Sequence, residues 1–425
     1  MRWSEFKRCT ARLARFIAAS QAQRWVLACA DPLVFAAALF AAWHAGKTAV
    51  IPPGFQAGTL RSLALADDAV LDDETAASAP DSPFEFQPLD AARAQVELYT
   101  SGSSGRPQRV VKQLRQLEAE VETLECMWGR MMANAAIVST VPHHHIYGLL
   151  FHLLWPLAYG RAFDTEAVGM PDALCERVQA LRDTVIVASP ARLARFPELG
   201  TLTALRPSPR LIFCSGGPLP ATAVRSYVDA LGMAPVEVYG STETGGLAWR
   251  QQPTPDSAWT PLPGVRVARA TDGALLVSSP HLTQGVEARV EDEVQLLDDG
   301  RFVLRGRLDR VVKIEEKRVS LPEIEGRLRA HPWVRDAAVI ALRSRRHELA
   351  AAIVLSEDGA HQMTIRGKRA MGRALRESLS AFYDPVLLPR RWRFPAELPR
   401  NERGKVAQYL LRALFAKDNH GPVAT

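Results

Sequence analysis

Apolar residues recur along the chain in patterns typical of helices and of buried strands. Spacings of three and four residues predict one helix whose apolar face is formed by Leu114, Leu117, Val121, Leu124, Trp128 and Met131. Short β-rich runs predict strands at 136–141, 184–188, 211–214 and 236–239. Because helical patterns alternate with these strands, we expect a parallel sheet covered by helices on both faces. Each run ends in a cluster of Gly, Pro, Ser or Thr, at the strand ends where such sheets bind ligands.

The segments before and after this region have different textures. The pattern predicts two apolar helices around 16–27 and 32–43, a short strand at 47–53, and a loop or linker between Asp67 and Pro83. From Pro263, short alternating strands are joined by the hairpin turns Asp272-Gly273 and Asp299-Gly300.

A further segment follows Asp309 and has the size of a small domain. We expect helices near 321–331, 363–380 and 406–415, and strands near 334–341 and 349–355. The predicted fold is therefore α/β, with a large N-terminal domain over 1–308, a β unit within it at about 262–308, and a smaller, mobile α+β domain over 309–425.

Composition indicates a soluble globular protein, since 47% of the 425 residues are hydrophobic and 23% are charged. The longest apolar run, 33–43, is too short to cross a bilayer, so no membrane insertion is expected. The first residues lack the pattern of a signal peptide. Five scattered cysteines without a C-x-x-C predict reduced core residues in a cytoplasmic protein.

The net charge of +6 is unevenly distributed. Residues 301–425 contain 26 Lys/Arg and 14 Asp/Glu, a net +12, which leaves −6 for residues 1–300. The arginines are dispersed and no nucleic-acid-binding motif accompanies them, so we expect that the protein does not bind nucleic acid. An acidic protein partner and a purely solubilising surface both fit this charge.

A loop rich in glycine and hydroxyl groups lies between two short apolar runs. It contains Thr100, Ser101, Gly102, Ser103, Ser104 and Gly105. Backbone N–H groups and hydroxyls of such a loop suit phosphate oxygens, although a solvated turn has the same composition. Arg106-Pro107-Gln108 replaces the Gly-Lys-Ser/Thr of a P-loop, which argues against a P-loop NTPase.

Three further patches follow strands. The first, His143-His144-His145-Ile146-Tyr147-Gly148, suggests a metal site, but consecutive extended residues point in opposite directions and do not reach one ion together. The others are Ser215-Gly216-Gly217 and Tyr239-Gly240-Ser241-Thr242-Glu243-Thr244-Gly245. Glu243 offers the single carboxylate that nucleotide-bound Mg²⁺ requires, while a plain strand-to-loop turn is the alternative.

In this order, the patches resemble the adenylate-forming superfamily, which contains acyl-CoA synthetases, aryl-acid ligases and adenylation domains. The resemblance covers the chain from about residue 90 to the end. It implies ATP and Mg²⁺ as cofactors, with phosphates at 100–105, nucleotide contacts at Ser215, Gly216, Gly217, Gly240 and Ser241, and adenine stacked on Tyr239. It further implies that Thr242 contacts the α-phosphate and that Glu243 binds Mg²⁺.

The same resemblance assigns the remaining roles. His145, Tyr147 and Gly148, with Gly217 and Gly245, line the acyl pocket, and His145 is counted among the catalytic residues. Asp292 binds ribose and Arg307 contacts nucleotide, while Asp309 is the hinge between domains. Lys405 is the catalytic lysine, which is needed for adenylation and moves away for the second step.

Three residues depart from the family pattern. Gln108 replaces a lysine, whose charge Arg109 or Lys112 can supply instead. Glu291 and Glu316 each replace a glycine, and Glu316 lies where the family's pantetheine thiol enters. The acidic residue with which amino-acid-activating relatives hold the substrate amine is absent near His145, which argues against an amino acid.

The sequence thus predicts an ATP-dependent ligase that activates a carboxylic acid, either an aryl acid such as a hydroxybenzoate or a fatty acid. The compact N-terminal part and the basic C-terminal part favour an acidic acyl carrier protein as the thiol acceptor. The chain resembles short ligases that load hydroxybenzoate-type starters for aryl-polyene (xanthomonadin-type) pigments. An acyl- or aryl-CoA ligase is the alternative, and a non-catalytic adenylate-binding regulatory protein is an alternative of another class.

Overall fold

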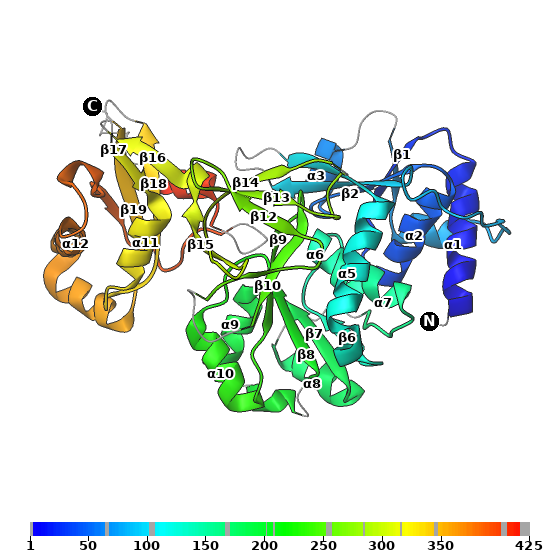
Figure 1. Cartoon of the computed structure of the whole chain (residues 1–425), viewed down its shortest axis with the longest axis horizontal. Helices are drawn as coiled ribbons and strands as arrows, with labels where there is room; N and C mark the ends of the chain where they lie inside the picture. Colours follow the sequence, from blue (N-terminus) through cyan, green and yellow to red (C-terminus); the bar gives the residue numbers. More distant parts are fainter. Residues whose placement is uncertain are drawn as a thin grey trace, which may run out of the picture.

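The molecule consists of a broad main part, which carries three sheets, and a separate C-terminal part to one side (Figure 1). The computed structural model describes residues 3–63, 68–101, 107–165, 171–200, 202–206, 209–251, 257–283, 285–314, 317–343, 347–400 and 406–416. The α/β fold class is confirmed, although each large sheet also contains antiparallel edge strands.

The first sheet has the strand order β3-β1-β2-β4-β5. Its strands are β1 (Arg24–Leu27), β2 (Thr48–Ile51), β3 (Ala69–Leu71), β4 (Gln95–Ser101) and β5 (Pro107–Gln113). Strands β1 to β4 are parallel, and β5 pairs with β4 in antiparallel fashion. The hairpin β4–β5 confirms the prediction that the phosphate-loop candidate joins two strands.

Two predictions in this region are wrong. A helix over 16–27 is not formed, because α1 (Trp3–Ala18) ends early and 24–27 is β1, a central strand with three buried residues. An all-apolar strand buried on both faces lacks the alternation that distinguishes it from a helix. The predicted linker 67–83 contains β3 and α4 (Asp73–Ser78), since β3 pairs with β1 and the Asp72 carboxylate caps α4.

The helix predicted at 32–43 is confirmed as α2 (Pro32–His44). Asp31 begins it, because its carboxylate accepts hydrogen bonds from the N–H groups of Leu33 and Val34. The short helix α3 (Ala57–Leu63) follows β2.

The second sheet has the order β11-β10-β9-β8-β7-β6, and its four predicted strands are confirmed. They are β6 (Ala136–Ser139), β7 (Thr184–Ala188), β8 (Leu211–Ser215) and β9 (Val236–Ser241), all parallel, followed by antiparallel β10 (Gly245–Arg250) and β11 (Thr260–Pro261). One face packs against α8 (Pro171–Leu181), α9 (Pro190–Glu198) and α10 (Ala221–Leu231).

The helix α5 (Leu114–Met132) joins the largest core, which reaches all three sheets of the main part. Its apolar face is as predicted except at the end, where Met131 is exposed and Met132 is buried. A step of four residues from Trp128 keeps Met132 on the buried face, whereas a step of three turns Met131 to solvent.

The third sheet is antiparallel and contains β12 (Arg266–Arg269), β13 (Ala274–Ser278), β14 (Ala288–Leu296) and β15 (Phe302–Arg307). The turns at Asp272-Gly273 and Asp299-Gly300 join its strands, as predicted; Gly273 and Gly300 both have positive φ, which glycine adopts without strain.

The C-terminal part, yellow to red in Figure 1, contains two small sheets and three α-helices among its described residues. These are β16 (Val311–Ile314), β17 (Lys317–Ser320), α11 (Leu321–Arg329), β18 (Val334–Arg343), β19 (His347–Leu355), α12 (Glu357–Ser380), β20 (Arg391–Arg393) and α13 (Gln408–Ala416). Separate apolar cores cover the two faces of β18–β19. The predicted domain limits 1–308 and 309–425 and the mobility of the smaller part stay predictions.

Within the described ranges, no helix is both long and apolar enough to cross a membrane. All five cysteines are free thiols. Cys126 is exposed on α5, so the prediction that all five lie in the core is wrong for this residue. The cytoplasmic location inferred from the cysteines stays a prediction.

Candidate active site

The hairpin between β9 and β10 presents Thr242 and Glu243 at its tip. Thr242 is half-buried and Glu243 is exposed. Ser241 and Thr244 brace the turn, because each backbone N–H donates to the hydroxyl of the other residue, at 3.1 and 3.2 Å. The turn requires glycine at 240, where an added Cβ would lie 2.2 Å from the carbonyl oxygen of Gly245. The sequence thus closes a tight turn that exposes one hydroxyl and one carboxylate.

Tyr239, Asp292 and Arg307 come together from three different strands. The Tyr239 hydroxyl donates to Asp292 Oδ2 at 2.6 Å, and Arg307 Nη1 lies 3.5 Å from the same oxygen. The pairing of β14 with β15 places Asp292 opposite Arg307. Burial, and then the Asp292 carboxylate, raise the pKa of the Tyr239 phenol. An aromatic ring beside a carboxylate and a guanidinium suits a base, a sugar diol and a phosphate.

The Ser215-Gly216-Gly217 turn lies beside this group. Ser215 Oγ donates to the carbonyl of Val238, the residue before Tyr239, at 2.8 Å. Gly216 has a φ of +97°, a conformation that favours glycine. The turn therefore starts at the end of β8 and stays in contact with β9.

Two buried residues that were not predicted from the sequence, Glu237 and Arg250, stabilise the chain just after this turn. Glu237 pairs with Arg250 through two contacts of 2.9 Å, and its Oε2 also accepts from the Leu219 N–H. The Arg250 guanidinium lies over the Trp259 ring. Glu237 is buried between the buried residues Val236 and Val238 in β9, so a charged residue inside an apolar run was the available signal.

The His145 to Gly148 patch begins a helix that contains α6 (Ile146–Gly148), a π-helix at Leu149–Leu154 and α7 (Trp155–Ala158). An added Cβ on Gly148 would lie 2.2 Å from the carbonyl oxygen of Pro142, so the sharp entry to the helix requires glycine. Burial, and then Cys214, raise the pKa of Tyr147. Since Cys214 precedes Ser215, this patch lies next to the glycine turn.

The three adjacent histidines have different surroundings. His143 is buried and its Nε2 lies 3.0 Å from the carbonyl of Cys29, while His144 packs edge-on against His145 at 4.5 Å between ring centres. No group of three metal-ligating side chains occurs among the residues described. His143 is explained by packing, with its ring 4.6 Å from Phe35.

Acidification is expected to destabilise the protein through His143. Burial lowers the pKa of His143 from 6.5 to about 4, so between these pH values the unfolded chain binds a proton that the folded chain does not. Stability is therefore lost as the pH falls from 6.5 towards 4, by about 3 kcal/mol for this group. Urea unfolding at pH 7.5 and 4.5 measures the loss. His143→Gln should reduce it and His361→Gln, at an exposed site, should not; equal losses in all three proteins would contradict this role.

Part of the predicted site falls outside the described residues. This applies to Gly102, Ser103, Ser104, Gly105, Glu316 and Lys405, and to the side chains of Thr100, Ser101 and Asp309. Arg109 and Lys112, the candidate substitutes for the missing lysine at 108, both have protein partners. Arg109 pairs with Glu97 at 2.8 Å, and Lys112 is buried against backbone carbonyls.

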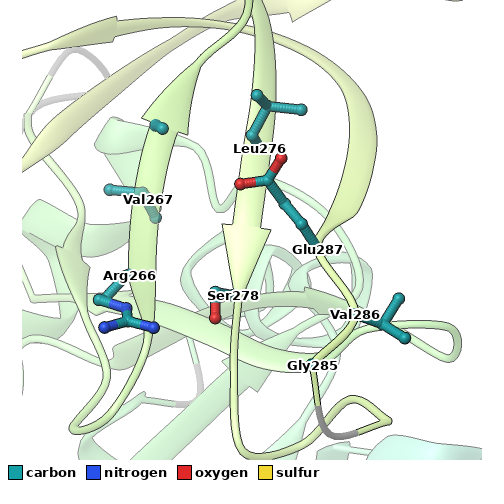
Figure 2. A pocket seen from close by; sticks show the side chains of 8 residues that line it. Arg266, Val267, Leu276, Ser278, Gly285, Val286 and Glu287 are labelled. Carbon is teal, nitrogen blue, oxygen red and sulfur yellow. The ribbon is translucent and has the colours of Figure 1, made fainter.

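Two cavities lie elsewhere. A hollow of about 330 Å³ lies on the third sheet. Arg266 lines it on one side and Glu287 on the other (Figure 2). An apolar groove of about 700 Å³ runs between α1, α2 and α5. Neither is lined by a predicted site residue.

Comparison with known proteins identifies the family of the chain, and the matched residues include the β9–β10 hairpin. The model of the AMP-binding enzyme family matches residues 55–286. The chain is 29% identical over 327 residues to the 4-coumarate–CoA ligase of Rhodobacter capsulatus, covering 77% of this chain and 78% of the relative. It is 30% identical over 323 residues to that of Cereibacter sphaeroides, covering 76% and 72%. The fold matches ATP-bound MatB from Rhodopseudomonas palustris with a TM-score of 0.80 at 20% identity, covering 98% and 94%.

Proposed function

Because the chain belongs to the AMP-binding enzyme family of the adenylate-forming superfamily and is an AMP-forming acid–thiol ligase, we propose that it converts an aryl carboxylic acid to its acyl adenylate and then to a pantetheine thioester. The observation that carries the proposal is the convergence of Tyr239, Asp292 and Arg307, the nucleotide-binding residues that the resemblance assigns.

Each group has a defined part in ATP binding. The Tyr239 ring stacks on adenine, the Asp292 carboxylate accepts hydrogen bonds from the ribose hydroxyls, and Thr242 donates to the α-phosphate. The exposed carboxylate of Glu243 fits Mg²⁺, which prefers one or two protein oxygens besides phosphate and water. The metal neutralises triphosphate charge, while the protein groups orient the nucleotide for attack by the substrate carboxylate.

The acid occupies a pocket formed by His145, Tyr147, Gly148, Gly217 and Gly245. The electrostatic effect of Cys214 on the Tyr147 pKa supports this pocket, because Cys214 belongs to the strand that leads into the glycine turn. An aromatic acid is favoured by the 4-coumarate ligases among the relatives, and a hydroxybenzoate remains our first candidate.

Lys405 and the hinge at Asp309 complete the cycle. A lysine is a compact positive charge that stabilises negative charge developing on the α-phosphate. Rotation of the C-terminal part about Asp309 then withdraws Lys405 and admits the thiol.

Coenzyme A and a carrier protein are the two candidate acceptors. The relatives favour coenzyme A. A carrier protein is favoured by α12, which lies at the outer end of the C-terminal part (Figure 1) and departs from helical conformation at Gly367. There, exposed Arg366, Lys368 and Arg369 surround Ile365, which is 65% exposed. Such a basic surface suits an acidic partner.

The test of the ligase function is acid-dependent exchange of labelled pyrophosphate into ATP. We expect exchange with at least one acid from a panel of hydroxybenzoates, cinnamates and fatty acids, and only in the presence of Mg²⁺. A failure of all acids, with retained AMP binding, would instead support a non-catalytic adenylate-binding protein.

The acceptor is then tested with coenzyme A and with an acidic holo acyl carrier protein. If the carrier protein is the acceptor, replacing Lys368 and Arg369 with glutamate should slow its acylation by about tenfold, since rim charges mainly set the association rate. Pyrophosphate exchange should be unchanged in this variant. Faster acylation of coenzyme A than of carrier protein would contradict the carrier-protein assignment.

A further inference from the structure

The Lys112 side chain is almost fully buried behind the hairpin that carries Glu243. It belongs to β5, the strand that follows the phosphate-loop candidate, and is 2% exposed. Its Nζ donates to the carbonyl of Glu243 at 2.8 Å and to the carbonyl of His281 at 3.2 Å. Burial of an ammonium costs free energy unless the charge is paired and hydrogen-bonded. Lys112 therefore needs a negative charge nearby in addition to these two carbonyls.

Glu120 on α5 provides this environment. Its carboxylate is buried, opposes the effect of burial on Lys112, and accepts from the Gly246 N–H at 2.6 Å. His281 is fully buried and completes the contact from the other side, with Nδ1 at 2.8 Å from the Gly246 carbonyl. Three side chains from separate segments therefore hold the backbone of the hairpin at Glu243 and Gly246.

The rest of the cluster fixes His281. Its Nε2 lies 3.1 Å from Thr123 Oγ1, and its carbonyl accepts from Gln116 Nε2 at 3.3 Å. Both partners belong to α5, so the helix holds His281 and Glu120 in one rigid arrangement. The Glu243 side chain itself is exposed, and Lys112 contacts the backbone of this residue.

We propose that Lys112 and Glu120 are positioning residues, which tie the strand after the phosphate loop to the Glu243 hairpin and so direct the Glu243 carboxylate to the metal on the triphosphate. This inference rests on the proposed function. It also assigns Lys112 a role other than that of a substitute phosphate ligand: its ammonium contacts the backbone that carries the metal ligand.

The test measures the affinity for ATP with and without Mg²⁺, and for adenosine, by calorimetry. Lys112→Met keeps most of the side-chain volume but removes the charge and the donors. In this variant, we expect the ratio of the ATP affinity with Mg²⁺ to that without Mg²⁺ to be at least tenfold smaller than in the wild type. The affinity for adenosine, which reaches Tyr239 and Asp292, should change less than twofold. A general loss of structure would weaken adenosine binding as well.

Arg161→Met is the matched control. Arg161 is also a largely buried cation that contacts α5, where it pairs with Glu125 at 2.6 Å. It also donates to the carbonyls of Gly129 and Ala133, at the end of α5 and away from the hairpin. It should leave the Mg²⁺ effect unchanged. If Lys112→Met does not fold, Glu120→Gln makes the same test, because it keeps an oxygen acceptor for Gly246 but removes the charge near Lys112.

A wild-type Mg²⁺ effect in folded Lys112→Met, or in Glu120→Gln where that variant replaces it, would overturn the positioning role alone. A wild-type protein that binds neither adenosine nor Mg²⁺·ATP would overturn the proposed function, and this inference with it.

Discussion

Replacing Lys405 with alanine is expected to lower acid-dependent pyrophosphate exchange by at least about 10²-fold, the scale of losing one preorganised group that stabilises transition-state charge. Negative charge accumulates around the α-phosphorus as the carboxylate attacks, and no neutral side chain replaces an ammonium there. The loss should fall on the rate and not on ATP affinity. Steady-state exchange kinetics over a range of ATP concentrations measure both.

Two comparisons make the Lys405 result specific. Lys368→Ala removes an exposed lysine from α12 and should leave exchange unchanged. When purified acyl adenylate is supplied, Lys405→Ala should still form thioester within threefold of the wild-type rate, because the role that we propose for Lys405 is confined to the first step. Equal losses in both steps would show that the substitution damages the whole protein and would remove Lys405 from its assigned role.

The second large effect is expected for Gly240→Ala. The new Cβ would lie 2.2 Å from the Gly245 carbonyl oxygen and 2.9 Å from Gly246 Cα, both of them backbone atoms that a rotamer change cannot move. The β9–β10 hairpin must open and displace Thr242 and Glu243. We expect exchange to fall at least about 10²-fold and stability to fall by about 1–3 kcal/mol, as measured by urea unfolding.

Gly326→Ala is the control for this substitution. Gly326 lies within α11, and no heavy atom stands within 4 Å of its added Cβ. Alanine favours the helix by up to about 1 kcal/mol over glycine, so stability should stay equal or rise. Exchange should not change. A Gly240→Ala protein with wild-type exchange would contradict the tight packing of the hairpin.

A helix with one apolar face, a long apolar run and short β-rich runs that end in turn residues were predictable from the sequence. These are α5, α2 and the parallel strands β6 to β9, and their order implies the second sheet. The strand β1 was not predicted, because Trp25, Val26 and Leu27 show no alternation and no Gly or Pro separates them from the preceding helix. Similarly, β3 and α4 depend on pairing with β1 and on the Asp72 cap, within a segment whose composition resembles a loop.

The site shows the same division. Tyr239, Asp292 and Arg307 were predictable because the order of several glycine-rich and charged patches is specific, and the structure joins the three around one carboxylate. Glu120 and His281 were not predicted, and neither was the buried position of Lys112. A polar residue in a core position is visible in the alternation of β5, where Val110 and Lys112 are buried and Val111 is exposed. The sequence does not show which groups Lys112 contacts.

The sequence by itself determined most local elements, the family and the residues that we propose for nucleotide binding. Only the tertiary structure decided that Lys112 bonds to the carbonyl of Glu243, 131 residues away, and that the Glu237 carboxylate accepts from the Leu219 N–H while it pairs with Arg250. The physical reason is that periodicity and turn chemistry act between near neighbours, whereas a buried charge is satisfied by whichever backbone group the packed chain brings within hydrogen-bond distance.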